Sequence, residues 1–203
     1  MILISILVYL FFSVVFCFSF YERFHLVRFL QVFFLCTLAS NAIIYSILNQ
    51  FSAINRPVLF LLIQIAVYLS LSIWILRKKN MSLNDYGKKI QGLFSGFRWF
   101  DYILSGLIVI LLAAFFTVGI STPPNNLDSL DHTNLTRILY WLQDGSYSYY
   151  SNSWSSILTD PILLHIQGIW LYSLGKSENL FFLVQWFSLA VAAATIFQIS
   201  RLL

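Results

Sequence analysis

The feature that most limits how this chain can fold is a series of five apolar runs, each about as long as the hydrocarbon core of a membrane is thick. The runs cover Ile2 to Phe20, roughly Phe29 to Leu48, Pro57 to Leu76, about Tyr102 to Ile120, and Leu180 to Leu203. A backbone inside lipid must satisfy its own hydrogen bonds, and a helix does so. We therefore expect an all-α polytopic membrane protein with about five transmembrane helices.

The composition excludes a soluble domain. The chain is 59% hydrophobic and only 10% charged, and so few charges cannot cover a water-facing surface, whereas lipid-facing helices need none. The net charge of +4 does not indicate a nucleic-acid partner, because six of the twelve basic residues fall between Arg77 and Arg98, between two apolar runs. The first run has no basic segment before it and no cleavage-type segment after it, so we expect an uncleaved span.

The distribution of Lys and Arg predicts the orientation of the spans. The connector after the first run carries two basic residues, the next carries one, and the loop from Arg77 to Arg98 carries six. Cytoplasmic loops are enriched in basic residues. The first and third connectors are therefore expected in the cytoplasm, which places the N-terminus and the polar segment Ser121–Glu178 on the non-cytoplasmic side.

Any chemistry is expected in the segment Ser121–Glu178, which lies between the fourth and fifth runs. It holds five of the eight acidic residues of the chain and two of its three histidines. These residues are Asp128, Asp131, His132, Asp144, Asp160, His165 and Glu178.

Two short helices are expected within this segment. The apolar positions of the first recur with helical period and are Leu135, Ile138, Leu139 and Leu142. Arg137 falls away from that stripe. The second helix is expected to begin at Asp160–Pro161, with Gly175 just after its end. Both are too short to span, so they are predicted to be juxtamembrane interfacial helices lying across the mouth of the bundle.

Asp128, Asp131 and His132 lie close together in the sequence, just after a span. A carboxylate held at a membrane surface can act as a general base on an acceptor hydroxyl. Alternatively, Asp128 and Asp131 can bind a divalent cation that neutralises a phosphate leaving group. The structural alternative is that one aspartate caps a helix and the other is solvated.

Arg137 and His165 are the remaining candidates for contacts to a substrate or a phosphate. The planar guanidinium of Arg137 suits a lipid phosphate, and the alternative is a side chain that extends to the membrane interface. Neither His132 nor His165 has the spacing of a metal-binding pair, and for each the alternative is a histidine with a structural partner. The chain contains no P-loop, dinucleotide fingerprint or nucleophile elbow.

The second half of the chain resembles polytopic glycosyltransferases of the GT-C type, above all bacterial members of the protein mannosyltransferase and aminoarabinose-transferase group. The likeness is carried by Asp128, Ser129, Arg137, Trp141, Gln143, Gly145, Ser146, Pro161, His165 and the run from Leu183 to Trp186. The likeness departs from the family pattern at Leu127, where a tryptophan is usual. It also departs in the segment that contains Pro161 and His165, which lacks the glutamate expected there. The spacing from Asp128 to Arg137 is one residue longer than in the family pattern. The position of the family's histidine can therefore correspond either to His132 or to Asn134.

This resemblance implies a sugar donor carried on a polyprenyl phosphate and transfer on the non-cytoplasmic face of a membrane, which in this group is the bacterial inner membrane. Asp128 is then the catalytic base or the carboxylate that positions the acceptor. Residues 1–100 form an N-terminal part with three spans and a basic cytoplasmic loop, and residues 101–203 form the start of the GT-C-like unit. Because such enzymes usually have many more spans, the chain is expected to be an N-terminal part, with a continuation or a separate chain supplying the rest.

Two other functions remain open from the sequence. A non-catalytic polytopic subunit or scaffold in envelope polysaccharide or lipid assembly fits the same spans. A small transporter is less favoured, because transporters place ionisable residues or paired broken helices inside their spans, and the five runs contain almost none.

Overall fold

The computed structural model describes residues 1–20, 26–79, 99–121, 135–147 and 162–202. These residues form α-helices and one short 3₁₀ helix, and no strand occurs among them. The elements are α1 (Ile2–Phe20), α2 (Leu26–Gln50), α3 (Pro57–Lys79), α5 (Trp99–Ser121), α6 (Leu135–Asp144), α8 (Ile162–Gly175), η3 (Glu178–Leu180) and α9 (Phe182–Leu202).

The predicted fold class is confirmed. Five of the described helices are long and apolar enough to cross a membrane, namely α1, α2, α3, α5 and α9. Each coincides with one of the apolar runs, and two short helices, α6 and α8, lie between α5 and α9 in the chain. The protein is therefore an integral multi-pass membrane protein.

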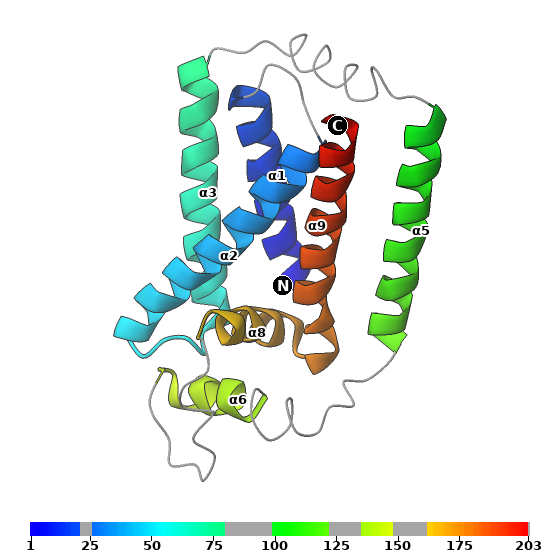
Figure 1. The fold of residues 1–203 in the computed structure, drawn as a ribbon. Coiled ribbons are helices and arrows are strands. Elements are labelled where there is room, and N and C mark those ends of the chain that lie inside the picture. The colour runs from blue at the N-terminus through cyan, green and yellow to red at the C-terminus, as the bar shows by residue number, and fades with distance from the viewer. Residues whose placement is uncertain (21–25, 80–98, 122–134, 148–161, 203) are drawn as a thin grey trace.

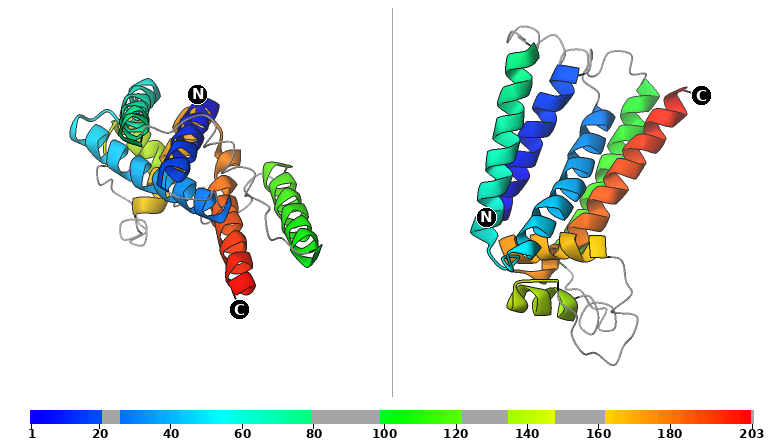
Figure 2. Two further views of the ribbon diagram at one scale, coloured as in Figure 1. Left: turned by 90° about the horizontal axis from the view of Figure 1, so that it is seen from above. Right: turned by 90° about the vertical axis from the view of Figure 1, so that its left-hand side faces the viewer.

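The long helices are arranged around α2 (Figures 1 and 2). α1 and α3 lie side by side and run in the same direction, whereas α2 runs back across them at a tilt and contacts α9 on its other side. α5 stands at the edge of the molecule and packs on α9. The contact uses aromatic rings: Phe116 packs against Phe182 and Trp186, and the Trp186 indole nitrogen donates to the Leu112 carbonyl at 2.8 Å.

α6 and α8 lie crosswise at one end of the long helices, as the sequence predicts (Figures 1 and 2). α3 begins at this end with Pro57, and α5 finishes there with Ser121. The last turn of α3, which carries Arg77, Lys78 and Lys79, lies at the opposite end. The two ends of the bundle thus differ in charge and in construction.

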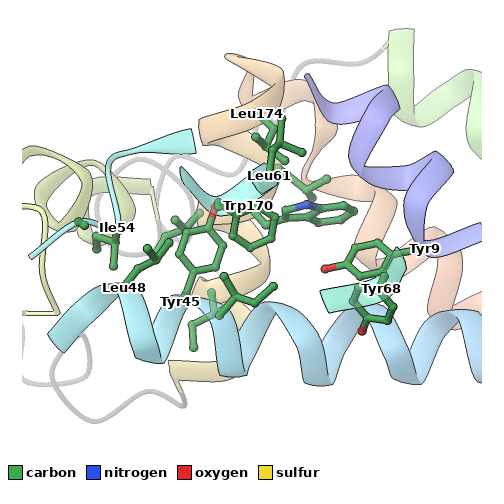
Figure 3. Close-up of a cluster of buried hydrophobic side chains, with 14 of the residues drawn as sticks. Tyr9, Tyr45, Leu48, Ile54, Leu61, Tyr68, Trp170 and Leu174 are labelled. Atoms are coloured by element: carbon green, nitrogen blue, oxygen red, sulfur yellow. The ribbon is translucent and has the colours of Figure 1, made fainter. Parts of the chain in front are cut away.

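Polar side chains in the spans bond to one another in the interior. The Ser5 hydroxyl on α1 donates to Gln64 Oε1 on α3 at 2.8 Å, and the Gln64 amide donates back to the Ser5 carbonyl at 3.0 Å. One helical turn farther along, the rings of Tyr9 and Tyr68 meet edge to face, with centroids 5.3 Å apart (Figure 3). Within a membrane, where apolar contact between helices gains little, such pairs hold helices in register.

Further buried polar contacts fix α8 to this bundle. The amide of Asn41 on α2 donates to Gln167 Oε1 at 2.7 Å, and the Trp170 indole nitrogen donates to the Ser5 hydroxyl at 2.9 Å. Asn41 also accepts from the Tyr9 hydroxyl at 2.6 Å. α8 is consequently joined to both α1 and α2 by groups that have no access to solvent, and its position across the bundle end is fixed.

Candidate functional site

α8 is covered on two sides, which explains why its sequence is apolar nearly all round. Every residue from His165 to Leu171 is buried. Gln167 and Trp170 face α1 and α2, while His165 and Gly168 meet α6. His165 and Gly168 therefore lie on the contact line of α8 with α6.

The predicted end of α8 is wrong by one residue. Gly175 is the last helical residue, and it is Lys176 that adopts the left-handed conformation, with φ of 56°. The Lys176 amide donates to the Tyr172 carbonyl at 2.7 Å and so closes the last turn. Gly175 serves a different purpose, because the Leu180 side chain occupies the space that a Cβ atom would take there.

The inward face of α6 also differs from the predicted stripe. Arg137, assigned to the outside, is only 4% exposed, whereas Leu139 is 39% exposed. Trp141 contributes to this burial, because its ring lies beneath the Arg137 guanidinium at 4.4 Å from the centroid. A guanidinium is planar and weakly hydrated, so it can be buried by stacking on an aromatic face where an ammonium could not.

Trp141 is the centre of a group of polar and aromatic side chains, here called the Trp141 cluster: Arg137, Trp141, Tyr147 and His165. The Trp141 ring lies 4.9 Å from that of Tyr147 and 5.9 Å from that of His165, centroid to centroid. Trp141 itself is 2% exposed and His165 is 3% exposed. Two candidates from the sequence, Arg137 and His165, are thus brought together on a single indole although 28 positions separate them.

The end of α6 and Tyr147 of the Trp141 cluster are anchored to the last turn of α2 and to the connector between α2 and α3. The backbone N–H of Ile54 donates to the Gly145 carbonyl at 3.1 Å, and the N–H of Tyr147 donates to Asn49 Oδ1 at 2.6 Å. Gly145 has φ of +77°, a conformation that turns the chain sharply at the end of α6. The platform at this end of the bundle therefore combines α6, α8 and the connector.

The hydroxyl of Tyr147 points into the interior of this platform. It is buried and makes no hydrogen bond within the described part of the chain. Burial raises the pKa of Tyr147 well above its usual value, and the nearby Tyr45 raises it further. The group therefore stays neutral at physiological pH and is unsuited to act as a base.

Three predicted site residues, Asp128, Asp131 and His132, lie outside the described residues. They belong to the segment that joins Ser121 to Leu135, and both of those residues lie at the platform end of the bundle. The described residues contain no group of three or more His, Cys, Asp or Glu side chains arranged to hold a metal ion. A divalent cation bound by Asp128 and Asp131 stays a prediction.

The packing roles of Trp141 and Asn49 were not predicted from the sequence. Trp141 stands at i+4 from Arg137, the spacing at which two helical side chains meet. This i+4 spacing is the sequence feature from which a buried Arg137, packed on Trp141, could have been predicted. Asn49 at the end of α2 left no comparable signal, because its partner is a backbone amide 98 positions away.

Replacing Gly145 by alanine is expected to destabilise the platform by about 2–4 kcal/mol, combining a strained left-handed residue with a steric overlap. An added Cβ atom would lie 2.6 Å from the Ser52 carbonyl oxygen, which is backbone and cannot easily move aside. Thermal unfolding of the purified protein measures the effect. The matched control is Gly106→Ala on α5, where nothing lies within 4 Å and the helix should gain slightly. Equal stability of the two variants would contradict the assigned turn.

Comparisons of the chain with protein-family models, with curated proteins and with solved structures find no match.

Proposed function

We propose that this chain is a membrane glycosyltransferase unit that transfers a sugar from a polyprenyl-phosphate donor, with its site at the platform formed by α6 and α8. In this proposal Asp128 acts as the base on the acceptor hydroxyl. Arg137 and His165 contact the donor phosphate or the substrate. The likeness of the second half of the chain to GT-C enzymes suggests the reaction, and the platform supports where it takes place.

The observation that carries the proposal is the fixed position of Arg137 and His165 in the Trp141 cluster at one end of the spans. The guanidinium of Arg137 lies on the Trp141 ring, and this contact holds the side chain in one place. A rigidly held guanidinium suits a phosphate, because the side chain loses little further freedom on binding.

The chain topology supports the same end of the bundle for Asp128. Ser121 ends a span at the platform, and Leu135 begins α6 there. Asp128 is seven positions from each, so it stays within reach of the platform whatever the path between them. A donor held in the membrane by its prenyl chain would present its phosphate at the same level.

We further propose that the platform faces the non-cytoplasmic compartment, because Arg77, Lys78 and Lys79 lie at the opposite end. With Cys17 and Cys36 replaced by alanine, a single cysteine at Gln143 should react with a membrane-impermeant maleimide on intact cells. In the same background, Lys78→Cys replaces a side chain that is also exposed, and this cysteine should react with the maleimide only after the membrane is permeabilised. The reverse pattern would place the platform in the cytoplasm and exclude a donor supplied from the outer side.

The reaction can be tested without knowing the sugar. The protein in lipid nanodiscs is incubated with polyprenyl-phosphate-linked glucose, mannose, galactose and aminoarabinose, each with a membrane extract as the source of acceptors. Release of polyprenyl phosphate, measured by mass spectrometry, is the product common to all of them. Release from at least one donor, absent from empty nanodiscs, is the expected result. No release from any donor would instead favour a non-catalytic subunit in envelope assembly.

A further inference from the structure

α1 and α3 keep one constant register along their length. Ser5 bonds Gln64 across a separation of 59 positions. The rings of Tyr9 and Tyr68, and the contact of the Lys79 ammonium with the Phe20 ring, have the same separation. Because the two helices run in the same direction, residues 59 positions apart lie at one level of their interface throughout.

Ser13 and Ser72 are the next pair in this register, one turn beyond Tyr9 and Tyr68. Ser13 is 0% exposed and Ser72 is 1% exposed. Neither hydroxyl makes a hydrogen bond to any described part of the chain, whereas the hydroxyls of Ser5, Tyr9 and Tyr68 in the same interface all do. Two buried hydroxyls without a partner in the described part of the chain thus lie at one level between two spans.

A buried hydroxyl without a hydrogen bond costs about 1–3 kcal/mol, and buried polar groups in proteins nearly always have a partner. From these two residues we infer that the interface of α1 and α3 binds an ordered water molecule between the Ser13 and Ser72 hydroxyls. The water accepts a hydrogen bond from one hydroxyl and donates one to the other. Its second O–H can donate a hydrogen bond to a carbonyl oxygen of the preceding turn, at Tyr9 or Tyr68.

Water is the ligand that fits the chemistry of this level. Both groups are neutral hydroxyls that can donate and accept, so they offer an ion no balancing charge. The Tyr9–Tyr68 ring contact closes the neighbouring level of the interface on one side, and Ile75, about one turn beyond Ser72 on α3, is buried. The inference concerns the interior of the bundle and does not depend on the proposed glycosyltransferase activity.

The test is a double-mutant cycle on thermal unfolding in nanodiscs, with Ser13→Ala, Ser72→Ala and both together. A bridging water predicts that each single change lowers Tm by about 2–4 °C, as expected for losing roughly 1 kcal/mol in a chain of this size. The double variant should lose about as much as one single variant, because the same water is lost in each. Thr117→Ala is the control, since that hydroxyl is exposed and bonds the Ala113 carbonyl of its own helix.

Additive changes, or single variants as stable as the parent, would overturn the inference, since each serine would then bond its own helix or remain dry. A direct bond between the two hydroxyls would also give coupling. Ser72→Asn separates the cases, because its amide reaches the position of the water. Retained Tm in Ser72→Asn supports a water-sized space, and a loss larger than that of Ser72→Ala shows that the hydroxyls touch and that no water is bound.

Discussion

Asp128→Asn is expected to lower the release of polyprenyl phosphate by at least about 100-fold, the lower limit of what a general base contributes. Asparagine keeps the size of the side chain and removes its ability to take a proton from an acceptor hydroxyl. The variant should reach the membrane in normal amounts, because the change keeps the size of the side chain and alters none of the apolar spans. The measurement is the donor assay with wild type and variant at equal protein content.

Asp144→Asn is the matched control for this prediction. Asp144 lies in the same polar segment, at the end of α6, and accepts a hydrogen bond from the Ser146 hydroxyl at 2.6 Å. We expect transfer to persist in this variant. If transfer also survives Asp128→Asn, Asp128 is not part of the mechanism. The platform would then remain the proposed site, with another residue acting as the base.

Trp141→Ala is expected to destabilise the protein by about 3–5 kcal/mol, the usual cost of deleting a buried tryptophan side chain. The indole is almost fully buried and contacts Arg137, Tyr147 and His165. Its loss leaves a cavity and deprives the Arg137 guanidinium of the surface on which it lies. In a chain of this length the fall in Tm should be about 10 °C.

The control for Trp141→Ala is Leu139→Ala, two positions away in the same helix on a side chain that is 39% exposed. That change should cost about 1 kcal/mol or less. Trp141→Phe should recover part of the loss, because a smaller ring still supports the guanidinium. If Trp141→Ala and Leu139→Ala lower Tm equally, α6 does not pack on α8 through this residue.

The spans and the two short helices could be predicted from the sequence, because each depends on a pattern contained within its own residues. Pro57 begins α3 as a first-turn proline should, and the run from Ile2 to Phe20 is a helix with those same bounds. The crosswise position of α6 and α8 also follows from length alone, since neither is long enough to span.

The errors arose where the partner of a residue, and not the polarity or type of the residue itself, decides its place. A search for apolar positions with helical period assigns Arg137 to the exposed face because it is charged. In the structure, Trp141 provides an aromatic surface on which the guanidinium is buried. Gly175 is of the residue type that ends helices, but Lys176 makes the turn, and the Leu180 side chain lies where a Cβ atom of residue 175 would be. The sequence shows that polar residues such as Asn41 lie inside the spans, but it does not show which helix they will meet.

The attachment of α8 to the first two helices has a consequence for biosynthesis. Asn41 and Gln167 are 126 positions apart, and Ser5 and Trp170 are 165 apart. At elongation rates of about 5–20 residues per second, Asn41 is made roughly 6–25 seconds before Gln167 exists. During that interval the newly inserted helices hold an amide in lipid that lacks its final acceptor. Completion of the interior therefore waits for the ribosome to pass α8, and a nascent chain stalled before that point would hold its first helices in an unfinished state.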